Sequence, residues 1–574
     1  MDRRMDADRA ALGRGAAGGV RRVAAARAAL LPLLLYALPL GFLALFFFFP
    51  LGAILRLSVG VRTAVDADDL AYFMRVVGFS AWLGAASAAL TLLVALPGAY
   101  MFARFRFPGA VALRALATVP FVLPTVVVAA AFGELLGPRG LLPAGLARLL
   151  PAGAPPLALE RSIWLVLLAH IFFNYSIVLR IVGGFWAGID VRLEQAAAVL
   201  GASRWRAFRY VTLPLLLPAI GAAALLVFIY CFASFSIVLI LGGAQMATVE
   251  VEIYRQTAQM LRLDVASALA LVQIAVTLLA TMAYTRLQER TSLALAARGH
   301  GANARPPRTL GERLLIVANA LLILLLIGTP LAALALRSLA SADGTPTLAF
   351  YHALGQNTTR SLFFVPPLVA VRNSLLFAMA TVALSLAVGV PAAYLLAQGR
   401  RGGWLTRVLD PLFTLPLGTS AVTLGLGYIV AFGAWGWQRS PLMVPVAHSL
   451  LAFPLVVRSL LPALRALDQR LREAARTLGA SPLQVLRQID LPLLAPAMLV
   501  GAVYAFTISL GDFGAVLLIG QNEYPTIPLV IYRFLGRPGG LNYGQAMALC
   551  TILMLVSLAC FALLERARPP QAEL

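Results

Sequence analysis

Twelve long apolar runs dominate this sequence, and each is about as long as a helix that crosses a membrane. Such a helix needs about 20 mostly apolar residues. The runs do not alternate polar with apolar positions, as the strands of a membrane β-barrel would. We therefore predict an all-α polytopic membrane protein with about twelve transmembrane helices. The runs cover about 30–55, 77–103, 112–136, 163–182, 219–241, 266–284, 314–336, 374–397, 408–432, 442–464, 493–518 and 544–564.

The charge distribution predicts how the chain lies in the bilayer. The 574 residues include 46 basic and 24 acidic side chains, which gives a formal net charge of +22. With the N-terminus in the cytoplasm, 32 arginines fall in loops on that side and 14 on the other. This positive-inside bias predicts that both termini are cytoplasmic. It also accounts for the basic charge without nucleic acid as a partner.

The chain contains no lysine, because all 46 basic residues are arginine. This excludes Schiff-base chemistry and the phosphate-binding loop GxxxxGK[ST], whose lysine contacts the β- and γ-phosphates. If ATP drives this protein, another polypeptide binds the nucleotide. The three cysteines, Cys231, Cys550 and Cys560, form no CxxC pair. They predict neither a disulfide nor a metal site.

The chain repeats itself. After a shift of 278 residues, segment 193–218 falls on segment 471–496 with 13 of 26 positions identical, and His170 falls on His448. Segment 96–103 resembles 390–397 at a different offset, so an outer loop differs in length between the copies. We predict two parallel six-helix repeats. The expected domains are a basic cytoplasmic leader (1–29), a first six-span half (30–287), a cytoplasmic linker (288–313), a second half (314–565) and a cytoplasmic tail (566–574).

The most similar segment lies in a predicted cytoplasmic loop of each half. Each copy is expected to form a short helix, a break at Gly201 or Gly479, and a second short helix capped by Ser203 or Ser481. Four apolar side chains are expected to project from the second helices: Trp205, Phe208, Leu483 and Leu486. A capped amphipathic helix of this kind fits a groove on a partner protein. The alternative is a helix that lies on the membrane interface beside its own bundle.

The segment LREAARTLGAS, followed by Leu491-Pro492, resembles the EAA-type loop of ABC importer permeases. In that family the loop is the coupling helix, which docks on a separate ATPase subunit. The first half departs from the pattern, because Gln195 takes the glutamate position and Glu194 precedes it. The resemblance implies docking roles for Glu194, Gln195, Ala196, Ala197, Gly201, Trp205, Phe208, Glu473, Ala474, Ala475, Gly479, Leu483 and Leu486.

The resemblance also implies partners and a location. The chain would be a transport subunit and no enzyme, in a bacterial inner membrane. It would bind no cofactor of its own. Two copies of a cytoplasmic ABC ATPase would use ATP and Mg²⁺, and a periplasmic or lipid-anchored binding protein would deliver the solute. ATP binding would draw the coupling helices together and open the halves outward.

Four further segments suggest the cargo. The segments 169–182, 231–243, 251–256 and 509–520 resemble the thiamine permeases within this family. The resemblance implies thiamine, or a related pyrophosphate or pyrimidine, as the solute. Ferric iron, which related fused permeases carry, is the alternative.

Six polar residues are candidates for the solute pathway: His170, Asn174, Tyr175, Ser234, His448 and Asp512. A polar side chain in hydrocarbon must find a partner, so each also has a structural interpretation. The two histidines can bond to neighbouring helices, and Asp512 can cap a helix break before Gly514. Arg180 and Arg458 are expected to anchor cytoplasmic ends of spans, and Phe46–Phe49 to face lipid.

Two other function classes fit less well. A twelve-span secondary transporter also has two six-span halves, but such proteins use ionisable residues at mid-membrane. The sequence suggests almost none there, and such a transporter needs no paired docking loops. A membrane enzyme or a metal site would need a cluster of acids, histidines and cysteines at one depth, which the sequence does not suggest.

Overall fold

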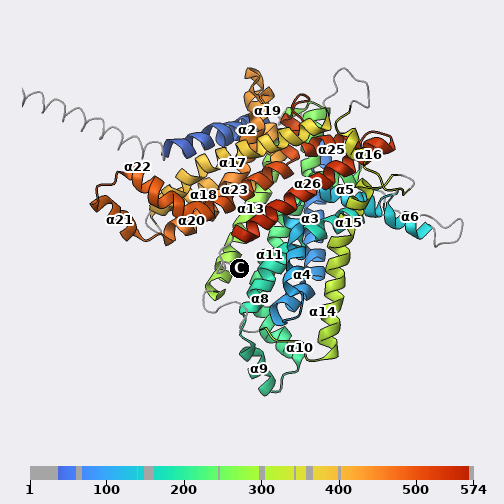
Figure 1. The fold of residues 1–574 in the computed structure, drawn as a ribbon, viewed down its shortest axis with the longest axis vertical. Coiled ribbons are helices and arrows are strands. Elements are labelled where there is room, and N and C mark those ends of the chain that lie inside the picture. Colours follow the sequence, from blue (N-terminus) through green and yellow to red (C-terminus); the bar gives the residue numbers. More distant parts are fainter. Residues whose placement is uncertain are drawn as a thin grey trace, which may run out of the picture.

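A computed structural model describes residues 36–59, 67–138, 140–147, 159, 161–243, 246–295, 304–341, 344–356, 366–398 and 403–567. The predicted leader and residues 568–574 of the predicted tail lie outside these ranges. Within them all regular elements are helices, apart from two isolated β-bridges. Eleven of the described helices are long and apolar enough to cross a bilayer, or twelve if one bent pair forms a single span. The all-α polytopic prediction is therefore confirmed (Figure 1).

The helices of the first half are α2 (Phe49–Val59), α3 (Ala67–Arg104), α4 (Ala110–Thr118), α5 (Thr125–Leu136), α6 (Leu141–Ala147), α7 (Ile163–Val178), α8 (Gly184–Gly188), α9 (Val191–Val199), α10 (Arg204–Ala207), α11 (Leu213–Phe232), α12 (Val249–Tyr254) and α13 (Leu263–Leu295). Five-residue π-helical turns join α7 to α8 and α10 to α11. Another π-helical turn precedes α2, so the first span is continuous over Tyr36–Val59.

The helices of the second half are α14 (Leu310–Ile323), α15 (Thr329–Ser338), α16 (Ala349–Ala353), α17 (Pro367–Gln398), α18 (Trp404–Thr414), α19 (Ala421–Phe432), α20 (Met443–Ala466), α21 (Gln469–Thr477), α22 (Pro482–Val485), α23 (Leu491–Gly511), α24 (Gly514–Ile519), α25 (Ile527–Leu535) and α26 (Gly540–Ala567). The halves extend as two arms, with α9 at the tip of one and α21 at the tip of the other (Figure 1).

The third span of each half is broken, which the sequence did not predict. The expected single helices over 112–136 and 408–432 are each two helices, and α18 meets α19 at 97°. Prolines lie at both breaks, Pro120 and Pro124 in one half and Pro416 in the other. Proline cannot continue the helical hydrogen-bond pattern. The twelve residues of α5 or α19 extend only about 18 Å, well short of the ~30 Å core of a bilayer.

The fifth and eleventh spans end earlier in the sequence than predicted. Helix α11 ends at Phe232 and α23 ends at Gly511, where single spans over 219–241 and 493–518 were expected. Beyond each end the chain continues as short helices, among them α12, α24 and α25. Irregular backbone at membrane depth is tolerated only where protein covers it or where it lines a cavity. These breaks therefore indicate where a cavity can lie.

The first span of each half packs against the other half. Helix α2 lies against α13 and α19, while α15 lies against α5 and α26 (Figure 1). Contact is close, because a Cβ at Gly427 would lie 3.1 Å from the Cβ of Pro50. Phe47 is buried, and the Phe49 ring lies 5.7 Å from that of Phe432. The prediction that Phe46–Phe49 faces lipid is therefore wrong for Phe47, whereas Phe49 is 41% exposed although its ring also contacts the other half.

The connection between the halves is fixed at one end. Helix α13 continues to Leu295 and α14 begins at Leu310, so the two helices enter the predicted linker from both sides. The backbone of Arg305 accepts a hydrogen bond from Arg106 N (2.9 Å) and donates one to Arg104 O (3.1 Å). The Arg305 guanidinium pairs with Glu312 at 2.6 Å. This part of the connection is therefore attached to the end of α3.

A buried carboxylate also joins the halves. Glu134 of α5 is 2% exposed, and its Oε2 accepts a hydrogen bond of 2.6 Å from the Tyr543 hydroxyl of α26. Its Oε1 lies 3.7 Å from Nε of Arg337 in α15. An acid at this depth is costly unless it is paired, so the three residues stabilise the packed halves as a unit.

We predict that Tyr543→Phe lowers the free energy of unfolding of the purified protein. The hydrogen bond goes to a charged acceptor, so a loss of about 1.5–3 kcal/mol is expected. In a Glu134→Gln background the same change should cost only about 1 kcal/mol, because the acceptor is then neutral. Thermal unfolding in detergent measures both. Equal losses in the two backgrounds would contradict the pairing.

Candidate functional site

The two predicted coupling loops share one backbone geometry. In the first, Ala202 N donates to Ala197 O (3.0 Å) and Gly201 N to Ala198 O (3.0 Å). This is a Schellman motif, and the second loop repeats it with Gly479. The φ angles are +86° at Gly201 and +85° at Gly479. A Cβ at either glycine would meet no heavy atom within 4 Å, so the left-handed backbone, rather than crowding, favours glycine.

Serine caps the second helix of each loop. The Ser203 hydroxyl accepts from Arg206 N (3.3 Å), and the Ser481 hydroxyl accepts from Gln484 N (3.3 Å). The Gln484 side chain in turn accepts from Ser481 N at 2.7 Å, which completes a capping box. The second helices are not separate, however. Each runs through a π-helical turn into the fifth or eleventh span, so that Arg204–Phe232 and Leu483–Gly511 are continuous.

The loops expose apolar side chains, but not quite the predicted set. Trp205 is 65% and Leu483 61% exposed. Phe208 instead stacks on Trp186 with ring centroids 6.1 Å apart, and Leu486 packs against the core. The sequence analysis missed Leu200 and Leu478, equivalent residues that are each 88% exposed. Both lie in the identical LGAS stretch, which was the available signal. The remaining predicted residues are exposed, except half-buried Glu194, Ala197 and Ala475.

Glu194 faces its own bundle. Its Oε1 accepts hydrogen bonds of 2.7 Å from Arg104 at the end of α3 and 2.7 Å from the Thr212 hydroxyl. In the second loop, Arg472 is the repeat equivalent of Glu194 and Asp490 that of Thr212. These two residues pair at 2.8 Å. The Tyr394 hydroxyl donates to the other oxygen of Asp490. The first loop is thus held by an ion pair to α3, and the second by the Arg472–Asp490 pair together with Tyr394 of α17.

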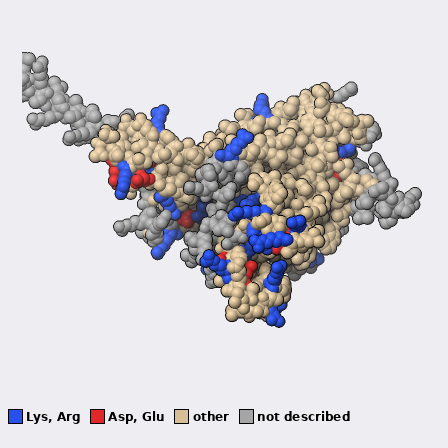
Figure 2. Space-filling model, turned by 60° about the horizontal axis from the view of Figure 1, so that its bottom comes forward, with Lys and Arg blue, Asp and Glu red and all other residues tan. Residues whose placement is uncertain are grey.

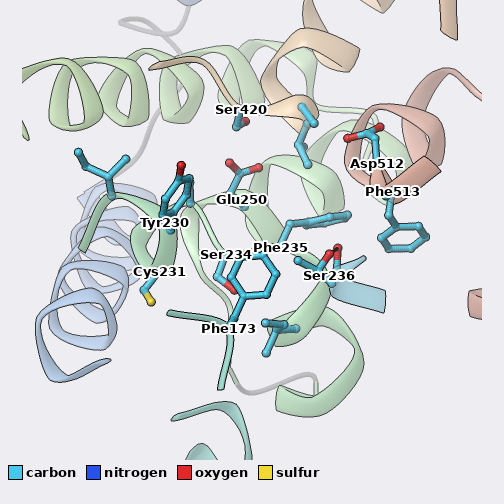
Figure 3. Close-up of a pocket in the computed structure, with 18 of the residues that line it drawn as sticks. Phe173, Tyr230, Cys231, Ser234, Phe235, Ser236, Glu250, Ser420, Asp512 and Phe513 are labelled. Carbon is cyan, nitrogen blue, oxygen red and sulfur yellow. Dashed lines mark hydrogen bonds between the residues drawn. The ribbon is translucent and has the colours of Figure 1, made fainter. Parts of the chain in front are cut away.

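The helix breaks of the two halves converge on one cavity of about 420 Å³ (Figure 3). Its wall combines the breaks before α5 and α19 with those after α11 and α23. The lining includes 121–125, 233–237, 417–422 and 511–514, together with residues of α7, α11, α12 and α13.

An aromatic row crosses this cavity between the halves. The rings of Phe235 and Phe513 stack with centroids 5.6 Å apart and an interplanar angle of 26°. Tyr254 lies 5.7 Å from Phe235, and Tyr532 lies 5.2 Å from Phe513. Phe513 and Tyr532 are the repeat equivalents of Phe235 and Tyr254, so the approximate two-fold axis passes between the stacked rings. Since α11 is about 30 Å long, the row lies about a membrane thickness from the coupling loops.

Both predicted histidines are buried and paired at both ring nitrogens. His170 lies between the hydroxyls of Ser87 (2.8 Å) and Ser234 (2.9 Å). His448 lies between the Ser509 hydroxyl (2.8 Å) and Asp512 Oδ2 (3.1 Å). These contacts match the structural interpretation of the two rings, and His170 also borders the cavity.

The other candidates divide between the cavity wall and the packing behind it. Asn174, Ser234 and Asp512 line the cavity, whereas Tyr175 and His448 do not. Asn174 donates to His170 O (2.9 Å), and Tyr175 packs against Gly98. Asp512 Oδ2 accepts from the backbone N–H groups of Ala515 (3.2 Å) and Val516 (3.4 Å). Asp512 therefore caps the start of α24 and lines the cavity at once (Figure 3).

The sequence analysis missed a carboxylate on this wall. Glu250 of α12 is fully buried, and its Oε1 accepts from Gln273 of α13. Glu252 lies two residues along the same helix, away from the cavity. Glu134 and Glu252 are likewise buried acids in the described part of the chain, and the sequence analysis did not anticipate them. No repeat signal marked Glu250, because its equivalent is Pro528.

Comparison with known proteins decides the family. Residues 95–293 and 389–568 each match the family described as binding-protein-dependent transport system inner membrane component. The chain belongs to this family. The two matches cover the greater part of both halves, which confirms two fused ABC importer permease units and counts against a secondary transporter.

Individual relatives extend over nearly the whole chain. The thiamine transport system permease protein of Brucella abortus is 29% identical over 542 residues, covering 91% of this chain and 93% of its own. That of Escherichia coli is 28% identical over 501 residues, covering 86% and 88%. The molybdenum transport system permease protein of Haemophilus influenzae is 34% identical over 212 residues, which is 91% of its length but 34% of this chain. A permease of about half this size therefore matches one part of the fused chain.

We predict that Glu194→Gln loosens the first coupling loop alone. A half-exposed ion pair contributes about 1 kcal/mol or less, so backbone amides of α9 should exchange with deuterium up to about fivefold faster. Asp490→Asn is the matched variant, and it should accelerate exchange in α21 but not in α9. Mass spectrometry of the two loop peptides measures both. Unchanged exchange in α9 would show that the pair does not hold the loop.

Proposed function

We propose that this chain is the membrane subunit of an ATP-driven importer for thiamine or a close derivative. The observation that carries the proposal is the pair of equivalent Schellman-and-serine loops, each built onto a helix that ends at one shared cavity. In this proposal two copies of a cytoplasmic ABC ATPase dock on the loops. A periplasmic or lipid-anchored binding protein delivers the solute, and both chain termini are cytoplasmic.

Exposed apolar and basic side chains support docking at the loops. Leu200 and Trp205 in the first loop, and Leu478 and Leu483 in the second, have no cover from their own bundles. Exposed arginines surround the first loop, and Figure 2 shows them gathered at that end of the molecule. A basic end of this kind is typical of the cytoplasmic side. Apolar residues at such an end fit the surface of a protein partner.

The continuous helices supply a route from the loops to the cavity. When an ATPase dimer closes, the docked loops move toward one another. The second helix of each loop is continuous with α11 or α23, and these helices end at the breaks that form the cavity wall. The stacked pair Phe235 and Phe513 lies just past those ends. Movement of the loops would therefore reach the aromatic row directly and change which side the cavity faces.

The cavity chemistry favours thiamine among the alternatives considered. Thiamine carries a positively charged thiazolium ring and an aminopyrimidine ring. The described lining offers Glu250, Asp512 and several aromatic faces, and includes no arginine. A pyrophosphate would need cationic or N–H donors in number. A ferric ion would meet two carboxylates, and the described residues hold no cluster of three or more metal-ligating side chains.

Uptake in a defined system tests this function. Proteoliposomes holding this chain with the ATPase and binding protein encoded beside it should accumulate labelled thiamine when ATP is supplied on the ATPase side. The chain alone should hydrolyse no ATP, because it has no lysine for a nucleotide loop. Accumulation of ferric iron without thiamine would keep the permease assignment and overturn the cargo. ATP hydrolysis by the isolated chain would overturn the assignment itself.

We predict that Gly479→Glu leaves the spans inserted but releases the ATPase and stops transport. A side chain at φ +85° costs about 1 kcal/mol or more, and the new charge adjoins the exposed apolar Leu478. Gly201→Glu should act in the same direction. Gly479→Asn is the matched control, because asparagine tolerates left-handed backbone and adds no charge. ATPase retained on affinity-purified permease measures the effect. Normal retention in both glutamate variants would favour helices that lie on the membrane interface.

A further inference from the structure

Glu250 is a carboxylate without a counter-charge at the wall of the central cavity. It lies in α12 of the first half, is fully buried, and borders the cavity. Its Oε1 accepts from Gln273, while its Oε2 accepts no hydrogen bond of good geometry and has the Ser420 hydroxyl as its polar neighbour. Figure 3 shows the carboxylate pointing toward Ser420, which begins α19 of the second half.

Glu252, in the same helix, is a buried carboxylate whose hydrogen-bonding capacity is met by the protein. Glu252 accepts hydrogen bonds from the Tyr72 hydroxyl (2.9 Å) and Gln256 Nε2 (2.7 Å), and it pairs with Arg255 at 3.4 Å. Glu250 has no ion-pair partner in the described part of the chain. Burying a carboxylate without a counter-charge is costly, so its retention beside a cavity calls for a ligand that completes it.

Asp512, the second carboxylate on the cavity wall, already has hydrogen-bond partners within the protein. Asp512 caps the start of α24 and contacts His448. Glu250 has no equivalent in the second half, where Pro528 takes its place. The unsatisfied charge therefore belongs to a single site to one side of the two-fold axis, not to a symmetric pair.

Aromatic side chains surround the space next to Glu250. Phe173, Tyr230, Phe235 and Phe513 all line the cavity (Figure 3). A cation over an aromatic face is stabilised by the negative potential of the ring, and the more so where water is excluded. The Arg180 guanidinium is not part of the lining, although it lies over the ring of the lining residue Phe121 at 5.2 Å.

We propose that Glu250 is the counter-ion for a positively charged aromatic solute, which binds in this cavity within the permease itself. The proposal rests on the proposed function and specifies its recognition site. Ser420, which faces the carboxylate, belongs to the other half, and Gln273 is also bonded to Thr423 of that half (3.4 Å). Separation of α12 from α19 would move Ser420 away from the carboxylate and leave more of it facing the cavity. Exposure of the charge is thereby linked to movement between the halves.

Direct binding to the assembled permease–ATPase complex, without the binding protein, tests this site. Labelled thiamine is titrated against the complex in lipid nanodiscs, for the natural chain, Glu250→Gln and Glu252→Gln. Glu250→Gln should weaken binding at least tenfold, whereas Glu252→Gln should change it less than threefold. Glu250→Asp keeps the charge and should retain part of the affinity. A competitor with a neutral thiophene in place of the thiazolium should bind the natural chain and Glu250→Gln within threefold of each other.

Uptake by the complete system with its binding protein, measured in parallel, separates the two proposals. If the natural chain transports thiamine but Glu250→Gln binds it as tightly, the inference is overturned and the function stands. The same holds if the natural complex transports thiamine but binds none without the binding protein. If the natural chain transports no thiamine, the proposed function is overturned and this inference falls with it.

Discussion

Within a bilayer every backbone polar group must find its partner inside the protein, because the hydrocarbon supplies none. The architecture follows from this constraint. Four helices are interrupted at membrane depth, two in each half, and all four interruptions line one cavity. Elsewhere the first span of each half bridges the two halves, because α2 lies against α13 and α19, and α15 lies against α26 and α5. The broken helices are thereby covered by protein, as the missing hydrogen bonds require.

Two long helices connect the loops to the cavity. A left-handed glycine ends the first helix of each coupling loop, and from the following serine onward the chain is helical as far as the cavity. The second helix of each loop is therefore the first turn of a long helix that ends at the cavity. The ion pairs at Glu194 and Arg472 attach the remaining part of each loop to its bundle.

Much of this fold could be predicted from the sequence, because span length, arginine bias and the repeat each follow from local composition. The glycine break and serine caps were predictable for the same reason. The broken spans were not, since a run such as 408–432 is apolar throughout and only Pro411 and Pro416 hint at the bend. Glu250 was not predicted as a site residue, because candidates were chosen from positions that match between the halves. Its equivalent in the second half is Pro528. Leu200 and Leu478 were not predicted as exposed residues, because a leucine at a helix end is usually expected to pack in the core.

The two halves are alike at the loops and differ at the cavity wall. The backbone of the two loops is nearly the same in both halves, with the same Schellman motif and serine cap. The residues that hold the loops may reverse sign, as Glu194 and Arg472 do, because only the pairing matters there. At the cavity the requirement is opposite, since a solute without two-fold symmetry cannot satisfy two equivalent walls at once. Ser234 opposite Asp512, and Pro528 opposite Glu250, give the cavity one acidic arrangement instead of two. Fusion of the halves into one chain fixes which wall receives each residue, and so makes an asymmetric site possible within a symmetric frame.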